Sequence, residues 1–286
     1  MNIQNARFDK LLGFLQPGTS LSGEEKLLTL RSATADELVK SYVALGSPFP
    51  PWQITADGSF IRSMPGPHAL SKHRHVHHLK RVLLGDCADE GSIFALQVDR
   101  MKWTSQKILE LFQDGLGEEN GKEIAAMYRI SPEITNEQLS DCLREFISDV
   151  SWSQPIRATV RSYSGRPTYA YHISEGNPFP GPNYGRAHHC IDLLFPFLTY
   201  QAYLPTQQQD LALEWADRWL DFIHGSEPWS PYTLDSPVLM HFTSGSGGAQ
   251  EVSESAIPNF DRLELVARLQ DKIAEVAKHI RGTHSQ

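Results

Sequence analysis

Two short segments of the chain carry side chains that could together perform acid–base chemistry, and the first supplies an acid. Glu90 lies in a run of Asp, Glu, Gly and Ser that follows the short apolar stretch 82–84. A carboxylate at the carboxyl end of a buried parallel strand can accept the Nδ1 proton of a histidine, which fixes the tautomer of the ring and stabilises the imidazolium. For this segment alone, an ordinary acidic loop that includes Asp86, Asp89 and Glu90 is the commoner outcome.

A pair of histidines supplies the candidate base. His188 and His189 directly precede an apolar segment that begins near Cys190. Imidazole titrates near neutral pH, so a histidine that reaches over a sheet edge is well suited to take up and return a proton. A structural pair, with one ring capping a helix that begins near Cys190, is the commoner outcome for this segment alone. These residues by themselves leave the choice between the two rings open.

The spacing of apolar residues predicts the elements that must position these side chains. Helical spacing, capping boxes that begin at Thr34 and Thr135, and an aromatic-rich stretch closed by Gly225 predict helices. These helices are expected at 8–15, from Thr34, at 108–112, from Thr135, at 211–222 and at 263–280. Strands are expected at 82–84, 169–173 and 239–242, and a hairpin turn at Asp57-Gly58. Strands separated by long helical crossovers predict an α/β fold with a mostly parallel sheet and helices on both faces.

The composition excludes several classes of protein. The 286 residues are 40% hydrophobic and 21% charged, so the chain can build a core. A net charge of −8 argues against nucleic acid as a partner, because phosphate binding requires basic patches. Three cysteines, Cys87, Cys142 and Cys190, exclude a disulfide framework. No apolar run predicts a membrane span and no signal peptide is recognisable, so the compartment is unknown and the chain as it stands is expected in the cytoplasm.

Several stretches of the chain resemble the type-B carboxylesterases, the family that includes the cholinesterases and fungal lipases. They comprise a leucine- and arginine-rich helix pair, an aspartate–aromatic–proline segment, a tyrosine-rich strand and a Trp-Ser-Pro-Tyr run. These stretches are 24–38, 146–155, 167–173 and 229–232. The resemblance covers residues 6–232 in the family's order and implies the C-terminal part of an α/β-hydrolase fold. Residues 1–286 are therefore expected to form a single partial domain, ending in a Gly/Ser stretch and a helix over 244–282.

The resemblance also implies roles for the two segments. Glu90 matches the triad acid in the Asp-Glu-Gly motif of the family. The base of the family is followed, after two residues, by an acid, and His189 fits this pattern through Asp192. His188 would put Ile191 in the place of that acid. His189 is therefore the expected base, and His188 is the alternative.

The third member of such a triad is a serine within Gly-x-Ser-x-Gly, and this motif does not occur in the 286 residues. In the α/β-hydrolase fold, the nucleophile precedes the acid in chain order. The glycine-rich oxyanion loop of the family, which also precedes the acid, has no counterpart here. Ser20, Ser92 and Ser246 lack glycines at the required spacing, and Ser246 also follows the histidines. Each of these serines is interpreted as a turn or linker residue.

Five histidines crowd into a stretch of eleven residues that precedes the acidic segment. They are His68, His73, His75, His77 and His78. In an extended chain, three of these imidazoles would point to the same side and could bind zinc or copper. The flanking lysines and arginines favour a polar surface loop instead, so neither a metal nor another cofactor is predicted.

These observations lead to one main hypothesis and two alternatives. The chain is expected to be a truncated member of the carboxylic-ester hydrolase family, inactive alone, whose parent enzyme acts on small-molecule esters through an acyl-enzyme. One alternative is a subunit of a split esterase that is completed by an N-terminal half or by self-association. The other is a non-catalytic interaction protein of the same family, and retention of both Glu90 and His189 argues against it. The sequence leaves open whether the chain alone is an enzyme.

Overall fold

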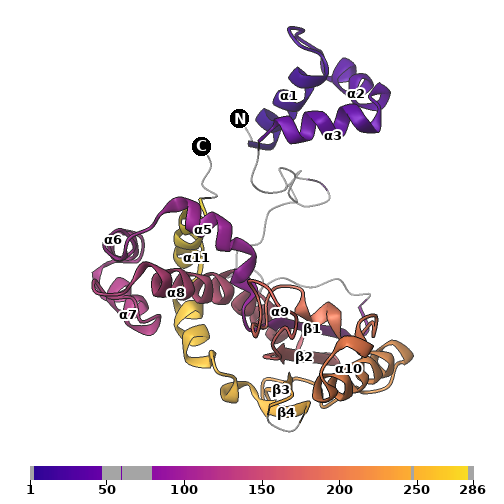
Figure 1. Ribbon diagram of the computed structural model, residues 1–286, viewed down its shortest axis with the longest axis vertical. Coiled ribbons are helices and arrows are strands. Elements are labelled where there is room, and N and C mark those ends of the chain that lie inside the picture. Colours follow the sequence, from indigo (N-terminus) through magenta and orange to yellow (C-terminus); the bar gives the residue numbers. More distant parts are fainter. Residues whose placement is uncertain (1–2, 47–58, 60–78, 246–247, 283–286) are drawn as a thin grey trace. The chain divides into compact units, whose positions relative to one another are not determined.

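The computed structural model describes residues 3–46, 59, 79–245 and 248–282 (Figure 1). The chain divides into two compact units, Met1–Met64 with Ser285–Gln286 and Pro65–His284. The hairpin turn predicted at Asp57-Gly58 and the histidine cluster at 68–78 lie outside the described residues. The prediction that 1–286 forms a single partial domain stays a prediction.

The described residues of the first unit form three helices. They are α1 (Ile3–Leu15), α2 (Gly23–Ser32) and α3 (Ala35–Ala44). The predicted capping box at Thr34 is confirmed, because its side chain accepts the backbone N–H of Glu37 at 3.3 Å and Glu37 Oε2 accepts the N–H of Thr34 at 2.8 Å. A second capping box joins Ser22 and Glu25 in the same way at the start of α2. Both boxes satisfy amide groups that the first helical turn leaves without partners.

The second unit is built around a four-stranded sheet in the order β1-β2-β3-β4. The strands are β1 (Val82–Cys87), β2 (Thr168–Ile173), β3 (Val238–Phe242) and β4 (Gln250–Ser253). The first three are parallel, which confirms the predicted mostly parallel sheet, and β4 pairs antiparallel with β3. The sequence did not predict β4, because its residues are polar and largely exposed and therefore show no apolar run or alternation.

Helices cover both faces of this sheet, as the sequence predicted. The face that carries Ala170 contacts α9 (Gln154–Tyr163) and the start of α11 (Phe260–Ile280), and the opposite face contacts α10 (Thr206–His224). On the α10 side, Trp215 is fully buried and stacks on Phe242 of β3 with ring centroids 4.0 Å apart. The aromatic-rich helix is therefore part of the core.

Gly85 shows how closely β1 and β2 approach on the α10 side. A Cβ atom at this position would overlap the ring of Tyr171, which lies across from Gly85 in the β1–β2 register. The ring in turn packs against Trp215 with centroids 5.5 Å apart. A glycine is therefore required at this point of the strand that leads to the acidic segment.

A group of helices follows the carboxyl end of β1 (Figure 1). They are α5 (Ala95–Met101), α6 (Ser105–Leu116), α7 (Glu118–Met127) and α8 (Asn136–Ser148). The side chains of Phe112, Tyr128 and Phe146 are fully buried among these helices and α11. A π-helical turn, η2 (Asp149–Ser153), connects α8 directly to α9, so α8 leads from this group of helices back to the sheet.

Four short 3-10 helices complete the part of the second unit that the structure describes. They are η1 (Glu90–Phe94), η3 (Ile191–Leu194), η4 (Gln201–Tyr203) and η5 (Glu254–Ala256). The first of them carries Glu90 and the second begins two residues after His189, so both candidate residues lie at the starts of short helical turns. None of the described helices is long and apolar enough to cross a membrane.

Candidate active site

The acid of the candidate site is Glu90, the first residue of η1. The side chain is buried, and its Oε1 atom accepts the backbone N–H of Cys87, the last residue of β1, at 2.9 Å. A buried carboxylate requires such donors, because water cannot solvate it. The carboxylate is therefore held directly at the carboxyl end of the strand, where the sequence placed it.

The base is His189. Its Nδ1 atom forms a hydrogen bond with Glu90 Oε2, and its backbone N–H donates to Ser92 Oγ at 3.2 Å. The ring lies against Trp152, with centroids 5.5 Å apart, and the side chain is 30% exposed. With Nδ1 turned to the acid, Nε2 is the nitrogen left for chemistry, and no described residue forms a hydrogen bond with it.

His188 has a different environment from its neighbour. Its Nδ1 atom forms a hydrogen bond with the carbonyl oxygen of His189 at 2.8 Å, and it does not contact Glu90. The structure therefore brings together Glu90 and His189 and leaves the alternative, His188, out of the pair. The proposed structural use of one ring as a helix cap is also not found, since neither ring bonds an amide of η3 among the described residues.

The two segments are joined beside the candidate pair. The backbone N–H of Asp89 donates to the carbonyl oxygen of Ala187 at 2.8 Å, and the carboxylate of Asp89 pairs with Arg186 at 3.1 Å. Asp89 lies one position before Glu90, and Ala187 and Arg186 lie two and three positions before His189. The two contacts connect positions about a hundred residues apart in the chain.

Gly91 explains why a glycine follows the acid. Its N–H donates to Ser148 Oγ on α8 at 2.6 Å, and a Cβ atom here would overlap the carbonyl oxygen of Arg144. Any side chain would push η1 away from α8. The Glu-Gly pair in the motif therefore combines a functional carboxylate with the close approach of two backbones.

Comparison with known proteins shows the family of the chain. The family model described as the carboxylesterase family matches residues 4–256. This chain belongs to the carboxylesterase family. Its structure is also similar to that of a solved protein named PNB esterase, with a TM-score of 0.62 at 17% sequence identity, over 92% of this chain and 53% of that one. A second structure of PNB esterase gives a TM-score of 0.61 at 17% identity, over 91% of this chain and 52% of that one.

The carboxylesterase chain thus spans about half the length of the solved esterases that it resembles. At this identity, the structural similarity shows the fold, which is the mixed, mostly parallel sheet with helices of an α/β-hydrolase. None of the curated proteins matches the chain by sequence.

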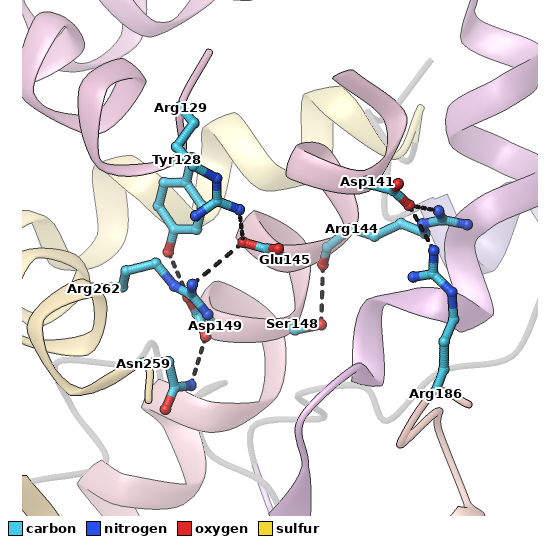
Figure 2. Close-up of polar contacts among 10 residues, drawn as sticks. All are labelled: Tyr128, Arg129, Asp141, Arg144, Glu145, Ser148, Asp149, Arg186, Asn259 and Arg262. Carbon is cyan, nitrogen blue, oxygen red and sulfur yellow. Dashed lines mark hydrogen bonds and ion pairs between the residues drawn. The ribbon is translucent and has the colours of Figure 1, made fainter. Parts of the chain in front are cut away.

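A polar network beside the site was not predicted (Figure 2). Asp149, at the end of α8, accepts hydrogen bonds from Tyr128 and Asn259 at 2.8 Å and from Arg262 at 2.6 Å. Burial raises the pKa of the Asp149 carboxyl, although the charge of Arg262 and these donors act in the opposite direction. Burial together with Asp149 also raises the pKa of the Tyr128 hydroxyl well above its usual value. The network ties α8 to α11, and its sequence signal was limited to the aspartate of the resembling segment 146–155.

A second polar cluster lies on the α9 side of the sheet. Asp86 was treated as an acid of an ordinary loop, but it lies in β1 and is buried. It accepts a hydrogen bond from Ser153 Oγ and contacts His172 Nδ1 at 2.8 Å. Leu84 and Asp86, like Ala170 and His172, share a face because side chains alternate along a strand. In the sequence, this alternation of side chains was the one pattern that could have indicated that Asp86 and His172 lie on the same face of the sheet.

The described residues contain no group of three histidine, cysteine, aspartate or glutamate side chains placed to hold a metal ion. The candidate pair therefore stands as the one arrangement of the described residues that sequence and geometry both indicate for catalysis. With Glu90 bonded to Nδ1, the arrangement is one in which His189 Nε2 could transfer a proton.

Proposed function

We propose that this chain is the acid- and base-bearing half of a serine-dependent carboxylic-ester hydrolase, with Glu90 as the triad acid and His189 as the base. The observation that carries the proposal is the hydrogen bond between His189 Nδ1 and the buried Glu90 carboxylate. It leaves Nε2, on a side chain that is 30% exposed, without a hydrogen-bond partner among the described residues. In this proposal both units of the chain belong to one partial hydrolase domain.

The reaction would follow the general course of serine ester hydrolysis. Nε2 of His189 takes the hydroxyl proton of a serine while the serine oxygen attacks the carbonyl carbon of the ester. The bond from this carbon to the alcohol oxygen then breaks, and Nε2 returns the proton to the alcohol. A water molecule attacks the acyl-enzyme in the same way, which releases the acid and restores the serine. Glu90 stays ionised throughout and stabilises the imidazolium.

In this proposal, the serine and the oxyanion donors come from polypeptide outside these 286 residues. The support is the absence of Gly-x-Ser-x-Gly and the match to only about half of each solved esterase. A nucleophile-bearing half would act as the complementing partner, and the chain alone would be inactive. The proposal also includes the resemblance to the fungal lipases, which the sequence motifs indicated.

The outer edge of β1 supports such a partner. The N–H groups of Val82 and Ala88 donate to carbonyl groups on the β2 side at 3.0 and 2.9 Å. Because successive residues of a parallel strand face opposite edges, the amides of Leu83 and Gly85 point away from β2. Within 79–245 and 248–282, no strand pairs with this edge. A parallel strand of the nucleophile-bearing half would satisfy these groups.

The test measures hydrolysis of p-nitrophenyl acetate by the purified chain, alone and after co-expression with a polypeptide that carries Gly-x-Ser-x-Gly and is encoded directly upstream at the same locus. We expect no turnover by the chain alone and serine-dependent turnover by the complex. In the complex, His189→Gln should lower kcat by about a thousandfold or more, because the acid, base and nucleophile act as a unit. His188→Gln is the matched control and should leave kcat nearly unchanged.

Two outcomes would overturn the proposal. The first is turnover by the chain alone that an organophosphate abolishes, because the nucleophile would then lie within the chain. The second is a stable complex without turnover, or with turnover that survives His189→Gln. A stable but inactive complex would favour the non-catalytic interaction protein of the same family.

A further inference from the structure

The two loops of the candidate site are attached to each other by Arg186. This residue lies three positions before His189, and its Nη1 atom pairs with Asp89 Oδ2, one position before Glu90, at 3.1 Å. The backbone bond from Asp89 N–H to the Ala187 carbonyl oxygen runs parallel to this ion pair at 2.8 Å. One side-chain contact and one backbone contact thus bridge the loops immediately beside the acid and the base.

A third attachment point lies on α8. The Nη2 atom of Arg186 reaches Asp141 Oδ1 at 2.8 Å, and Arg144 binds the same carboxylate oxygen (Figure 2). One turn further along α8, Ser148 Oγ accepts the N–H of Gly91 in the acid loop at 2.6 Å. Asp141, Arg144 and Ser148 are spaced as i, i+3 and i+7, so they share one face of the helix. This face of α8 holds both loops.

The backbone next to the base adopts a conformation that needs support from surrounding contacts. Cys190, directly after His189, adopts a φ of 67°, which is unfavourable for a residue with a Cβ atom. Such a conformation persists only where surrounding contacts impose it. On the N-terminal side of the base, Arg186 and Ala187 contact Asp89, and Arg186 also contacts α8. The backbone N–H of Asn177 also donates to the carbonyl oxygen of Arg186 at 3.0 Å.

Charge adds to the geometric argument. Asp89 is largely buried and lies next to the carboxylate of Glu90 in the chain, and Arg186 is its ion-pair partner. Burial and the charge of Arg186 both lower the pKa of the Arg144 guanidinium. The two arginines therefore depend on neighbouring carboxylates to offset the repulsion between their positive charges. Removal of Arg186 would leave Asp89 beside the acid without its ion-pair partner, and only the charge of Arg144 would still attract it. The acid loop would then be held less firmly to the base, because the backbone hydrogen bonds would have to hold it without the ion pair.

We propose that Arg186 is a positioning residue that, through Asp89 and Asp141, holds His189 Nδ1 within hydrogen-bonding distance of Glu90. The inference rests on the proposed function for its catalytic meaning, but the distance that it concerns is a property of this chain alone. Arg186 is 36% exposed and Asp141 is 43% exposed, so the ion pair between them contributes little to overall stability, and the pair of Arg186 with Asp89 is partly exposed on the arginine side. Removal of Arg186 is therefore expected to affect the site more than the fold.

The primary test uses the low-field proton resonance of the hydrogen bond between His189 Nδ1 and Glu90 in the complete chain. This resonance is assigned by its loss in His189→Gln. We expect Arg186→Met to abolish or broaden it, and Arg186→Lys to retain part of it because the charge remains without the bidentate geometry. Arg129→Met is the matched control, since Arg129 pairs with Glu145 at the same helix but touches neither loop. It should leave the resonance unchanged, and the melting temperatures of the variants should be similar.

A second variant keeps the test decisive if Arg186→Met does not fold. Asp141→Asn removes the α8 attachment while leaving the Arg186–Asp89 pair, and it should weaken the same resonance. In the complemented enzyme, Arg186→Met should lower kcat about 10- to 100-fold with little change in KM, as expected for a displaced base. A resonance that stays at its wild-type position in Arg186→Met or, failing that, in Asp141→Asn would overturn the positioning role. Loss of the resonance in a complex that never hydrolyses esters would uphold that role and refute the proposed function.

Discussion

His172 offers a prediction at the scale of a single residue, because its charge depends on a buried partner. Burial lowers the pKa of this imidazole, but the charge and hydrogen bond of Asp86 outweigh that effect, so the net pKa is raised above its ordinary value of 6.5. Asp149 and Glu90 act in the same direction. The ring of His241 also lies nearby, with centroids 5.8 Å apart, and burial followed by the charge of His172 lowers the pKa of His241.

A raised histidine pKa stabilises the folded chain only while the histidine is protonated. The contribution of His172 is therefore fully present below about pH 6.5 and is lost as the pH rises through the raised value. We expect His172→Gln to reduce the free energy of unfolding more at about pH 6 than at about pH 9, as measured by urea denaturation. His224→Gln, which removes an exposed imidazole, is the control. An equal loss at both pH values would show that His172 is neutral in the folded chain.

The attachment of α9 to the chain around η5 belongs to the scale of elements. Arg157 on α9 pairs with Glu254 at 2.9 Å, and both side chains are 5% exposed. Arg161, also on α9, pairs with Glu254 at 2.7 Å. The Tyr232 hydroxyl donates to the Glu254 carboxylate at 3.0 Å. Burial would raise the pKa of the Glu254 carboxyl, but the two arginines outweigh burial and lower it. Its stabilising contribution is present above the ordinary value of 4.5 and is lost as the pH falls through the lowered value.

Glu254→Gln should therefore destabilise the chain by about 3 to 5 kcal/mol at neutral pH, because it removes the buried partner of Arg157 and leaves this buried cation with only the half-exposed Glu264. Glu264 also binds Arg157 but is half exposed, so Glu264→Gln should cost at most about 1 kcal/mol. Equilibrium urea unfolding at neutral pH measures both variants. Equal effects of the two substitutions would contradict the importance of burial for this pair.

At the scale of the whole molecule, the outer edge of β1 is expected to determine whether the isolated chain self-associates. Its apolar residues Val82, Leu83 and Leu84 lie in a strand with one paired edge in the described sheet, and an open edge recruits other chains. We expect the isolated chain to self-associate and to bind a hydrophobic dye, and co-expression with the nucleophile-bearing half to suppress both. Size-exclusion chromatography and dye fluorescence measure these effects. A stable monomer with low dye binding and a cooperative melt would show that the edge is already protected.

The sequence by itself determined the features that are local or that repeat at short spacing. The capping box at Thr34, the strand around 169–173 and the aromatic helix closed by Gly225 follow from neighbouring residues. The preference for His189 over His188 came from the resemblance to the carboxylesterases, whose base is followed after two residues by an acid, here Asp192. The α/β class could be predicted because apolar periodicity reports directly on elements and their ends, whereas the family was predicted from the resembling motifs.

The tertiary structure alone decided which distant polar groups meet. Asp149 and Arg262 are 113 residues apart, and Arg186 and Asp89 are 97 apart, so no local spacing predicts either pair. The polar strand β4 was missed for the same reason, since its pairing with β3 depends on an available edge and not on its own side chains. Long-range contacts depend on how strands and helices pack in space. That packing makes Asp86, expected in a loop, a buried partner of His172. It also places the loop of the candidate acid against α8 and the ring of the candidate base against Trp152.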